Sequence, residues 1–131
     1  ERPANARPLT IAKFGDSDKA EVGDVCFAMG SPAGLSQSVT RGIIANVAMI
    51  SPQRGSFRLD GENVGQLVRW LGHDAIIFPG NSGGPLVDNR GNVIGVITYG
   101  RNNILQPNGD IEKSEGLNFA IAAEHIKALL P

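Results

Sequence analysis

Short apolar stretches rich in β-branched residues recur along the chain, and they predict β-strands. The expected strands are Val25–Met29, Ser38–Val47, Gln66–Leu71, Pro85–Asp88, Val93–Tyr99 and Gly116–Ala120. Turn-forming sequences separate them, such as GSPAG at 30–34 and DNRGN at 88–92. Glycine, proline and asparagine favour chain reversals at such places. Many short strands with frequent turns are typical of an all-β domain.

The apolar pattern changes its period near the C-terminal end. In IAAEHIKALL, residues 121–130, the apolar positions at helical spacing are Ala122, Ile126, Leu129 and Leu130. This spacing predicts a short closing helix over 121–131 that packs on the sheet. Six antiparallel strands and a C-terminal helix predict a small closed β-barrel, because closure leaves no strand edge unpaired.

Two polar, glycine-containing stretches, 51–65 and 101–115, are too long for simple hairpin turns. Connections of that length in a compact domain are usually functional or mobile. A chain of 131 residues has room for one domain with a real core. We expect residues 1–22 to be a linker, 23–120 to form the barrel and 121–131 to form the helix.

Composition narrows the function classes. Hydrophobic residues make up 41% of the chain, and the formal net charge of −1 gives no reason to expect nucleic acid as a partner. No apolar run approaches the roughly 20 residues that span a bilayer. Cys26 is the only cysteine, so no internal disulfide forms, and its apolar surroundings favour a buried residue over a reactive thiol. No Cys/His spacing suggests a metal site, and no cofactor is expected.

The stretch PGNSGGPL, residues 79–86, surrounds one serine with turn-forming residues. A serine hydroxyl is a weak nucleophile unless a base accepts its proton and donors stabilise the oxyanion that follows. Gly80 can adopt backbone angles that direct its own N–H and that of Ser82 to one point. Gly83 and Gly84 leave space beside the hydroxyl for a substrate backbone. The alternative is a glycine-rich turn with an incidental serine.

The motif and its neighbourhood favour the first interpretation. GNSGGPL resembles the nucleophile motif of chymotrypsin-fold serine peptidases, in particular of the HtrA-like branch. The stretch at 15–47, with a G-x-P-x-G-L turn before a T-x-G-I strand, is similar to the entry into the second barrel of that branch. Residues 74–98 continue the similarity, and 116–126 resemble its closing strand and helix. The fold implied is therefore the second barrel of a double-barrel enzyme.

The resemblance implies a role for each residue of the motif. Ser82 is the acylated nucleophile, and the N–H groups of Gly80 and Ser82 form the oxyanion hole. Asn81 stands where many secreted trypsin-like enzymes carry an aspartate that pairs with a new N-terminus. A neutral amide cannot form that ion pair, so activation by zymogen cleavage is not expected. HtrA-like enzymes share this asparagine and are controlled by the ordering of loops.

The resemblance also indicates how a polypeptide substrate binds. Thr98, Tyr99 and Gly100 belong to the strand that pairs with an extended peptide, and such pairing recognises peptides through their backbone. The wall of the expected substrate pocket is formed by the residues just before the serine turn, namely Ile76, Ile77 and Phe78. A pocket lined in this way favours small or medium apolar side chains, since a buried acidic group would be needed to select a cation.

The base and the orienting acid of a catalytic triad are missing from these motifs. In the family both come from the first barrel, upstream of the stretches quoted above. His73 and His125 are the only histidines. His73 is adjacent to Asp74, but neighbouring strand residues point to opposite faces, and Asp74 is expected to be structural. His125 is expected to be a solvated or capping residue on the closing helix. Neither is favoured as the base.

Three interpretations follow. The chain is the C-terminal half of a two-barrel peptidase whose first half is missing, or a subunit that needs a partner to complete the triad. Alternatively it is a non-catalytic peptide-binding or scaffold module. We favour the first, because an intact serine motif is hard to explain in an enzyme that lost its activity long ago. The family resemblance implies a periplasmic or otherwise extracytoplasmic location and is compatible with homo-oligomers.

Overall fold

The computed structural model describes residues 2–31, 34, 37–49, 58–59, 62–63, 68–100, 103–105, 108–109, 111–113 and 117–131. Its main strands are β1 (Val25–Gly30), β2 (Ser38–Met49), β5 (Trp70–His73), β6 (Pro85–Asp88), β7 (Val93–Gly100) and β10 (Asn118–Ala122). A short 3₁₀ helix, η1 (Ser17–Lys19), precedes them, and the helix α1 (Ala123–Lys127) follows. Within the described part of the chain, no helix is long and apolar enough to cross a membrane.

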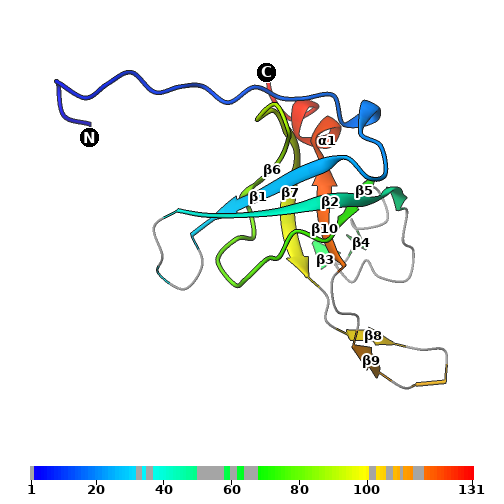
Figure 1. Cartoon of the computed structure of the whole chain (residues 1–131). Helices are drawn as coiled ribbons and strands as arrows, with labels where there is room; N and C mark the ends of the chain where they lie inside the picture. The colour runs from blue at the N-terminus through cyan, green and yellow to red at the C-terminus, as the bar shows by residue number, and fades with distance from the viewer. Residues whose placement is uncertain are drawn as a thin grey trace.

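The six main strands form a closed antiparallel barrel in the order β1-β2-β5-β10-β7-β6 (Figure 1). The predicted fold is therefore confirmed, including the short C-terminal helix. The β6–β7 hairpin turns where the sequence indicated, with a positive φ of 79° at Gly91 and a hydrogen bond from its N–H to the Asp88 carbonyl. Closure pairs both edges of the sheet, because β6 returns to β1.

Alternating side chains fill the barrel. In β1, Cys26 and Ala28 are fully buried, whereas the residues between and beside them are half-buried. Ile44, Leu71, Leu86 and Ile97 contribute the largest apolar side chains of the interior. Burial, and to a smaller extent the Asp74 carboxylate, raises the pKa of the Cys26 thiol to about 11. Cys26 is therefore a buried, unreactive residue, as the sequence predicted.

Several predicted boundaries are corrected by the structure. The strand expected at Gln66–Leu71 overlaps β5, which begins at Trp70 and continues to His73; residues 66–67 lie outside the described part of the chain. The strand expected at Gly116–Ala120 is β10, which continues to Ala122. Within the two long polar stretches lie short hairpin strands, namely β3 (Arg58–Leu59), β4 (Glu62–Asn63), β8 (Asn103–Leu105) and β9 (Ile111–Lys113). No strands were expected in these long connections.

The closing helix is shorter than predicted. It begins at Ala123 and ends at Lys127, because Ala122 still belongs to β10. Leu129 and Leu130 were expected to pack on the sheet, but their exposed fractions are 82% and 53%. The helical spacing predicted the helix correctly, although its last apolar positions lie beyond the helix end.

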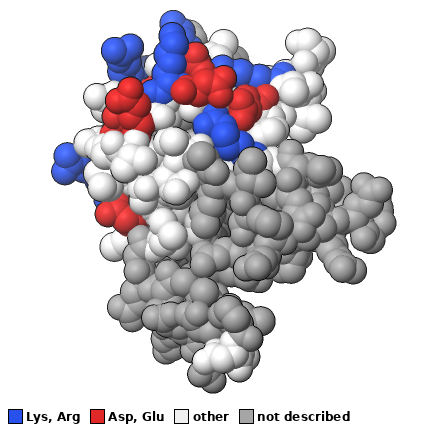
Figure 2. Space-filling model, turned by 90° about the vertical axis from the view of Figure 1, so that its right-hand side faces the viewer, with Lys and Arg blue, Asp and Glu red and all other residues white. Residues whose placement is uncertain are grey.

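Arg69 links the helix α1 and the N-terminal region to the barrel through hydrogen bonds and ion pairs. Its Nε lies 2.7 Å from Oε1 of Glu124, and its terminal nitrogens lie 3.1 Å from Oδ1 of Asp18 and 3.1 Å from the Val47 carbonyl oxygen. The hydrogen bond from Arg69 lowers the pKa of Glu124. Figure 2 shows Lys and Arg side chains interspersed with Asp and Glu side chains at this end of the molecule.

Candidate active site

Ser82 lies in a tight turn between β5 and β6. Gly80 and Gly83 have positive φ angles of 109° and 85°, in a region that side chains with a Cβ rarely adopt. The Asn81 N–H donates to the Phe78 carbonyl at 3.0 Å, and the Gly84 N–H donates to the Asn81 carbonyl at 2.9 Å. The glycines thus permit two successive reversals that present Ser82 at the surface, where it is exposed.

The turn is also attached to the neighbouring strand β7. The Gly83 N–H donates to the Ile97 carbonyl at 2.8 Å, and the Ile97 N–H donates to the Gly84 carbonyl at 2.9 Å. The Ser82 hydroxyl donates to the Thr98 carbonyl oxygen. Among the hydrogen bonds between described residues, none uses the N–H of Gly80 or of Ser82. These two donors can therefore bind an oxyanion without first losing a partner in the described part of the chain.

The other residues predicted to contact substrate lie around this turn. Ile76 and Phe78 have exposed fractions of 58% and 51%, whereas Ile77 packs against the core. Thr98 lies in β7 and its hydroxyl donates to the Phe119 carbonyl at 3.0 Å. Tyr99 and Gly100 complete β7, and the structure describes only their place in that strand. Residues 76–78 therefore lie close to Ser82 along the chain. Strand β7 contacts Ser82 through the hydrogen bond from its hydroxyl to the Thr98 carbonyl.

Asp74 is structural, as the sequence predicted. Its Oδ1 accepts a hydrogen bond from the Ile43 N–H at 2.7 Å, and its own N–H donates to the Ile43 carbonyl at 3.2 Å. The carboxylate therefore replaces a backbone partner at a place where the ladder between β2 and β5 ends. The described hydrogen bonds of Asp74 are therefore made to Ile43 of β2 and not to a histidine.

His73 is fully buried in β5, between Ile44 of β2 and Asn118 of β10. Neither ring nitrogen has a hydrogen-bond partner of normal geometry in the described part of the chain. Burial lowers the pKa of His73 from 6.5 to about 4, although the nearby Asp74 carboxylate opposes this shift. His73 is fully buried and its ring nitrogens have no described hydrogen bond to Ser82, so it is not placed as the base of that serine.

Because of His73, we expect the protein to lose stability in acid. The folded state binds a proton at His73 only near pH 4, whereas the unfolded state binds it near pH 6.5. The free energy of unfolding should therefore fall as the pH decreases from 6.5 toward 4, by about 3 kcal/mol in total from this group. His73→Leu should flatten this decline. Urea unfolding of both proteins at a series of pH values measures it, and parallel curves would contradict the assignment.

His125 also makes its described hydrogen bond to a residue other than Ser82. Its Nε2 accepts a hydrogen bond from the Arg69 N–H at 2.8 Å and lies 3.5 Å from Oε1 of Glu124. It therefore links the closing helix to the start of β5, whereas the sequence predicted a solvated or capping residue on the helix itself. Neither histidine makes a hydrogen bond to Ser82 among the described contacts.

A hollow of about 450 Å³ lies away from Ser82. Its lining comes from the N-terminal region and from the β6–β7 turn, and includes Asp16, Lys19, Asp24, Asp88 and Arg90. In the described part of the chain, no group of acidic, histidine and cysteine side chains is arranged to hold a metal ion. The candidate chemistry identified from the sequence is thus concentrated at the Ser82 turn.

Comparison with known proteins identifies a family and several relatives. Residues 3–96 match the family model of the trypsin-like peptidase domain. The chain is 38% identical over 125 residues to the periplasmic serine endoprotease DegP of Escherichia coli, covering 95% of this chain and 23% of that protein. It is 38% identical over 123 residues to the magnetosome formation protease MamE of Paramagnetospirillum magneticum, covering 94% of this chain and 15% of that protein.

Solved structures give the same result. The HtrA-type protease AlgW with a tripeptide has a TM-score of 0.68 and 36% identity, covering 95% of this chain and 36% of that one. The serine endoprotease from Yersinia pestis has a TM-score of 0.62 and 28% identity, covering 92% of this chain and 34% of that one. The chain therefore spans about a quarter or less of the length of the two curated relatives, DegP and MamE.

Proposed function

Because this chain belongs to the trypsin-like peptidases and is an HtrA-like serine peptidase barrel, we propose that it supplies the nucleophile, oxyanion hole and specificity pocket of a serine endopeptidase. Ser82 attacks the scissile carbonyl, and the N–H groups of Gly80 and Ser82 bind the oxyanion. The observation that carries this proposal is the turn itself, in which Ser82 is exposed beside two N–H donors that have no described partner.

We further propose that the catalytic base and its orienting carboxylate come from residues encoded upstream of this chain. The two histidines present are buried or engaged elsewhere, so neither is available to Ser82. We call this chain joined to those upstream residues the complete protein. In it, the Ser82 hydroxyl exchanges its hydrogen bond to the Thr98 carbonyl for one to the base, which accepts the proton as the acyl bond forms.

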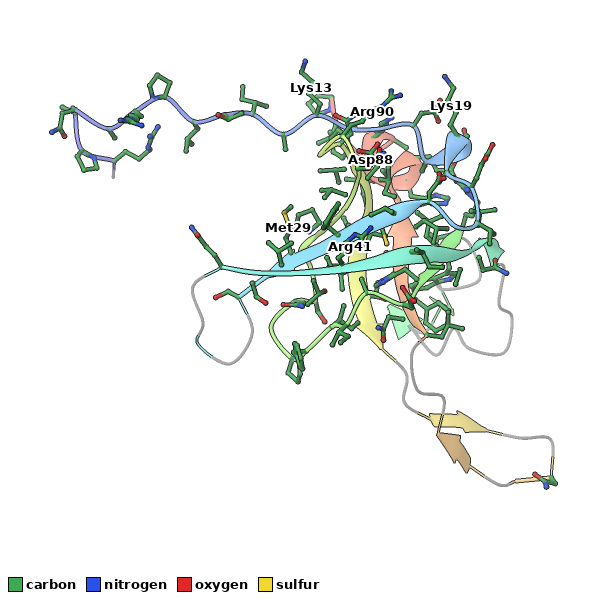
Figure 3. The ribbon with its side chains drawn as sticks, viewed as in Figure 1. Lys13, Lys19, Met29, Arg41, Asp88 and Arg90 are labelled. Carbon is green, nitrogen blue, oxygen red and sulfur yellow. The ribbon has the colours of Figure 1, made fainter. Side chains whose placement is uncertain are left out.

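An apolar surface on the outside of the barrel supports this proposal. Along β1 and β2, register places Val25 opposite Ile43 and Met29 opposite Val39. The exposed fractions of Val39 and Ile43 are 58% and 42%. Arg41 lies opposite Phe27 between these two pairs, so one charged side chain interrupts the apolar surface; Figure 3 shows Met29 and Arg41 on the two adjacent strands. An uncovered apolar surface of this kind is characteristic of a docking site, and the missing half of the enzyme would cover it.

The N-terminal region supports the same arrangement. It joins the barrel through Phe14, which bridges to Val93, and through the Gly15 N–H, which donates to the Val93 carbonyl at 2.8 Å. Before that point the chain runs away from the barrel (Figure 1), and Leu9 and Ile11 have exposed fractions of 71% and 85%. Apolar side chains so exposed are available to pack on the proposed upstream half.

Cleavage-site mapping tests the proposed activity. The complete protein should cut an unfolded polypeptide after small or medium apolar residues and not after Arg or Lys, because Ile76, Ile77 and Phe78 provide no buried acidic group for a cation. Mass spectrometry of the products reads the residue before each cut. Predominant cleavage after basic residues would contradict the pocket assignment. No cleavage by a folded protein with intact Ser82 would contradict the activity.

A further inference from the structure

The nucleophile turn, residues 80–84, lies directly against the C-terminal end of β1, and two glycines permit the approach. A Cβ atom added at Gly30 would lie 2.7 Å from the Asn81 Cα atom and 2.8 Å from its Cγ atom. A Cβ atom added at Gly84 would lie 2.9 Å from the Asn81 carbonyl oxygen and would overlap that of Met29. Backbone atoms cannot rotate out of such contacts, so a side chain at either position would displace the turn.

Asn81 is the residue held by this contact. Its exposed fraction is 1%, and neither atom of its side-chain amide has a hydrogen-bond partner in the described part of the structure. The Gly80 carbonyl accepts only a long hydrogen bond of 3.4 Å from the Ser31 N–H among the described backbone contacts. Close packing of atoms, more than hydrogen bonding, therefore holds residues 80–81 against the end of β1.

We propose that Gly30 and Asn81 are positioning residues for the reaction. The absent side chain at Gly30 lets Asn81 sit against β1, and this contact fixes the flanking peptide units, which carry the N–H groups of Gly80 and Ser82. The inference rests on the proposed function, because it concerns the oxyanion hole of that same site. A displacement of about 1 Å in a catalytic group costs about 100-fold in rate.

Steady-state kinetics of the complete protein with Gly30→Ala test the inference. The substitution should lower kcat by about 100-fold and change KM little, since it moves donors that act in the transition state. Gly91→Ala is the control. Gly91 has a positive φ of 79°, which Gly30 does not, so this change strains the backbone, but Gly91 lies in the β6–β7 turn and an added Cβ there meets nothing within 4 Å. The control should retain its kcat.

A second variant keeps the test decisive if Gly30→Ala does not fold. Asn81→Ala removes an amide that has no described partner, so the thermal midpoint should change little, whereas kcat should fall about tenfold because the turn loses its support. A kcat for either folded variant equal to that of Gly91→Ala would overturn the inference. If the unmodified complete protein itself shows no hydrolysis, the proposed function fails instead, so the two failures are distinguishable.

Discussion

Ser82→Ala in the complete protein is expected to lower kcat/KM for a peptide substrate by about 10⁴- to 10⁶-fold. Covalent catalysis ends when the hydroxyl is removed, and only the oxyanion hole and substrate binding remain to accelerate attack by water. Ser82 is exposed, and its hydroxyl bonds only to the Thr98 carbonyl among the described residues. The free energy of unfolding should therefore change by about 0.5 kcal/mol or less. Initial rates and thermal unfolding measure the two effects separately.

Ser38→Ala is the matched control for this substitution. Ser38 begins β2, and it belongs neither to the nucleophile turn nor to the proposed substrate wall. The same loss of one hydroxyl should leave kcat/KM unchanged there. If Ser82→Ala retained activity close to that of Ser38→Ala, Ser82 could not be the nucleophile.

The 131-residue chain by itself is expected to hydrolyse the same peptide at least about 1000-fold more slowly than the complete protein. Its serine has no base within reach among the described residues, because His73 is fully buried and His125 accepts the Arg69 N–H. A neutral hydroxyl that donates to the Thr98 carbonyl is a poor nucleophile. Equal concentrations of the two proteins are compared, and the Ser82→Ala form of each gives the background rate.

Rapid hydrolysis by the 131-residue chain would show that the base lies within it. His73→Leu and His125→Ala would then identify that base, because only one of the two substitutions should abolish the rate. Loss of activity in Ser82→Ala but in neither histidine variant would point to an unassisted serine. That result would contradict the proposal that an upstream base activates Ser82.

The barrel could be predicted from the sequence because its strands follow local rules. Cys26 and Ala28 alternate with half-buried neighbours in β1, and Asn89 and Gly91 mark the hairpin turn that follows β6. The end of β5 was predicted two residues too early, at Leu71, because Gly72 is unfavourable in strands by local propensity. An added Cβ there would lie 3.3 Å from the Asn46 Cβ atom, so close packing explains this glycine.

The candidate site, too, was only partly predictable from the sequence. Ser82, Gly80 and Gly83 form a local motif, and their backbone angles agree with what the glycines indicated. The sequence marked Gly30 only as part of the GSPAGL turn, and its close approach to Asn81 could not be predicted, since only the folded barrel creates that contact. The exposure of Leu129 and Leu130 was also unpredictable from spacing alone, because the helix ends before them.

The rate at which a fluorophosphonate probe labels Ser82 reports whether an upstream base completes the site. Such a probe reacts rapidly with a serine only when a base and an oxyanion hole act together. We expect stoichiometric labelling of the complete protein, mapped to Ser82 by mass spectrometry, and labelling at least about 1000-fold slower in the 131-residue chain. No labelling of the complete protein at Ser82 would favour a non-catalytic peptide-binding module. Equal labelling rates in the two proteins would equally contradict the proposed division of the catalytic groups.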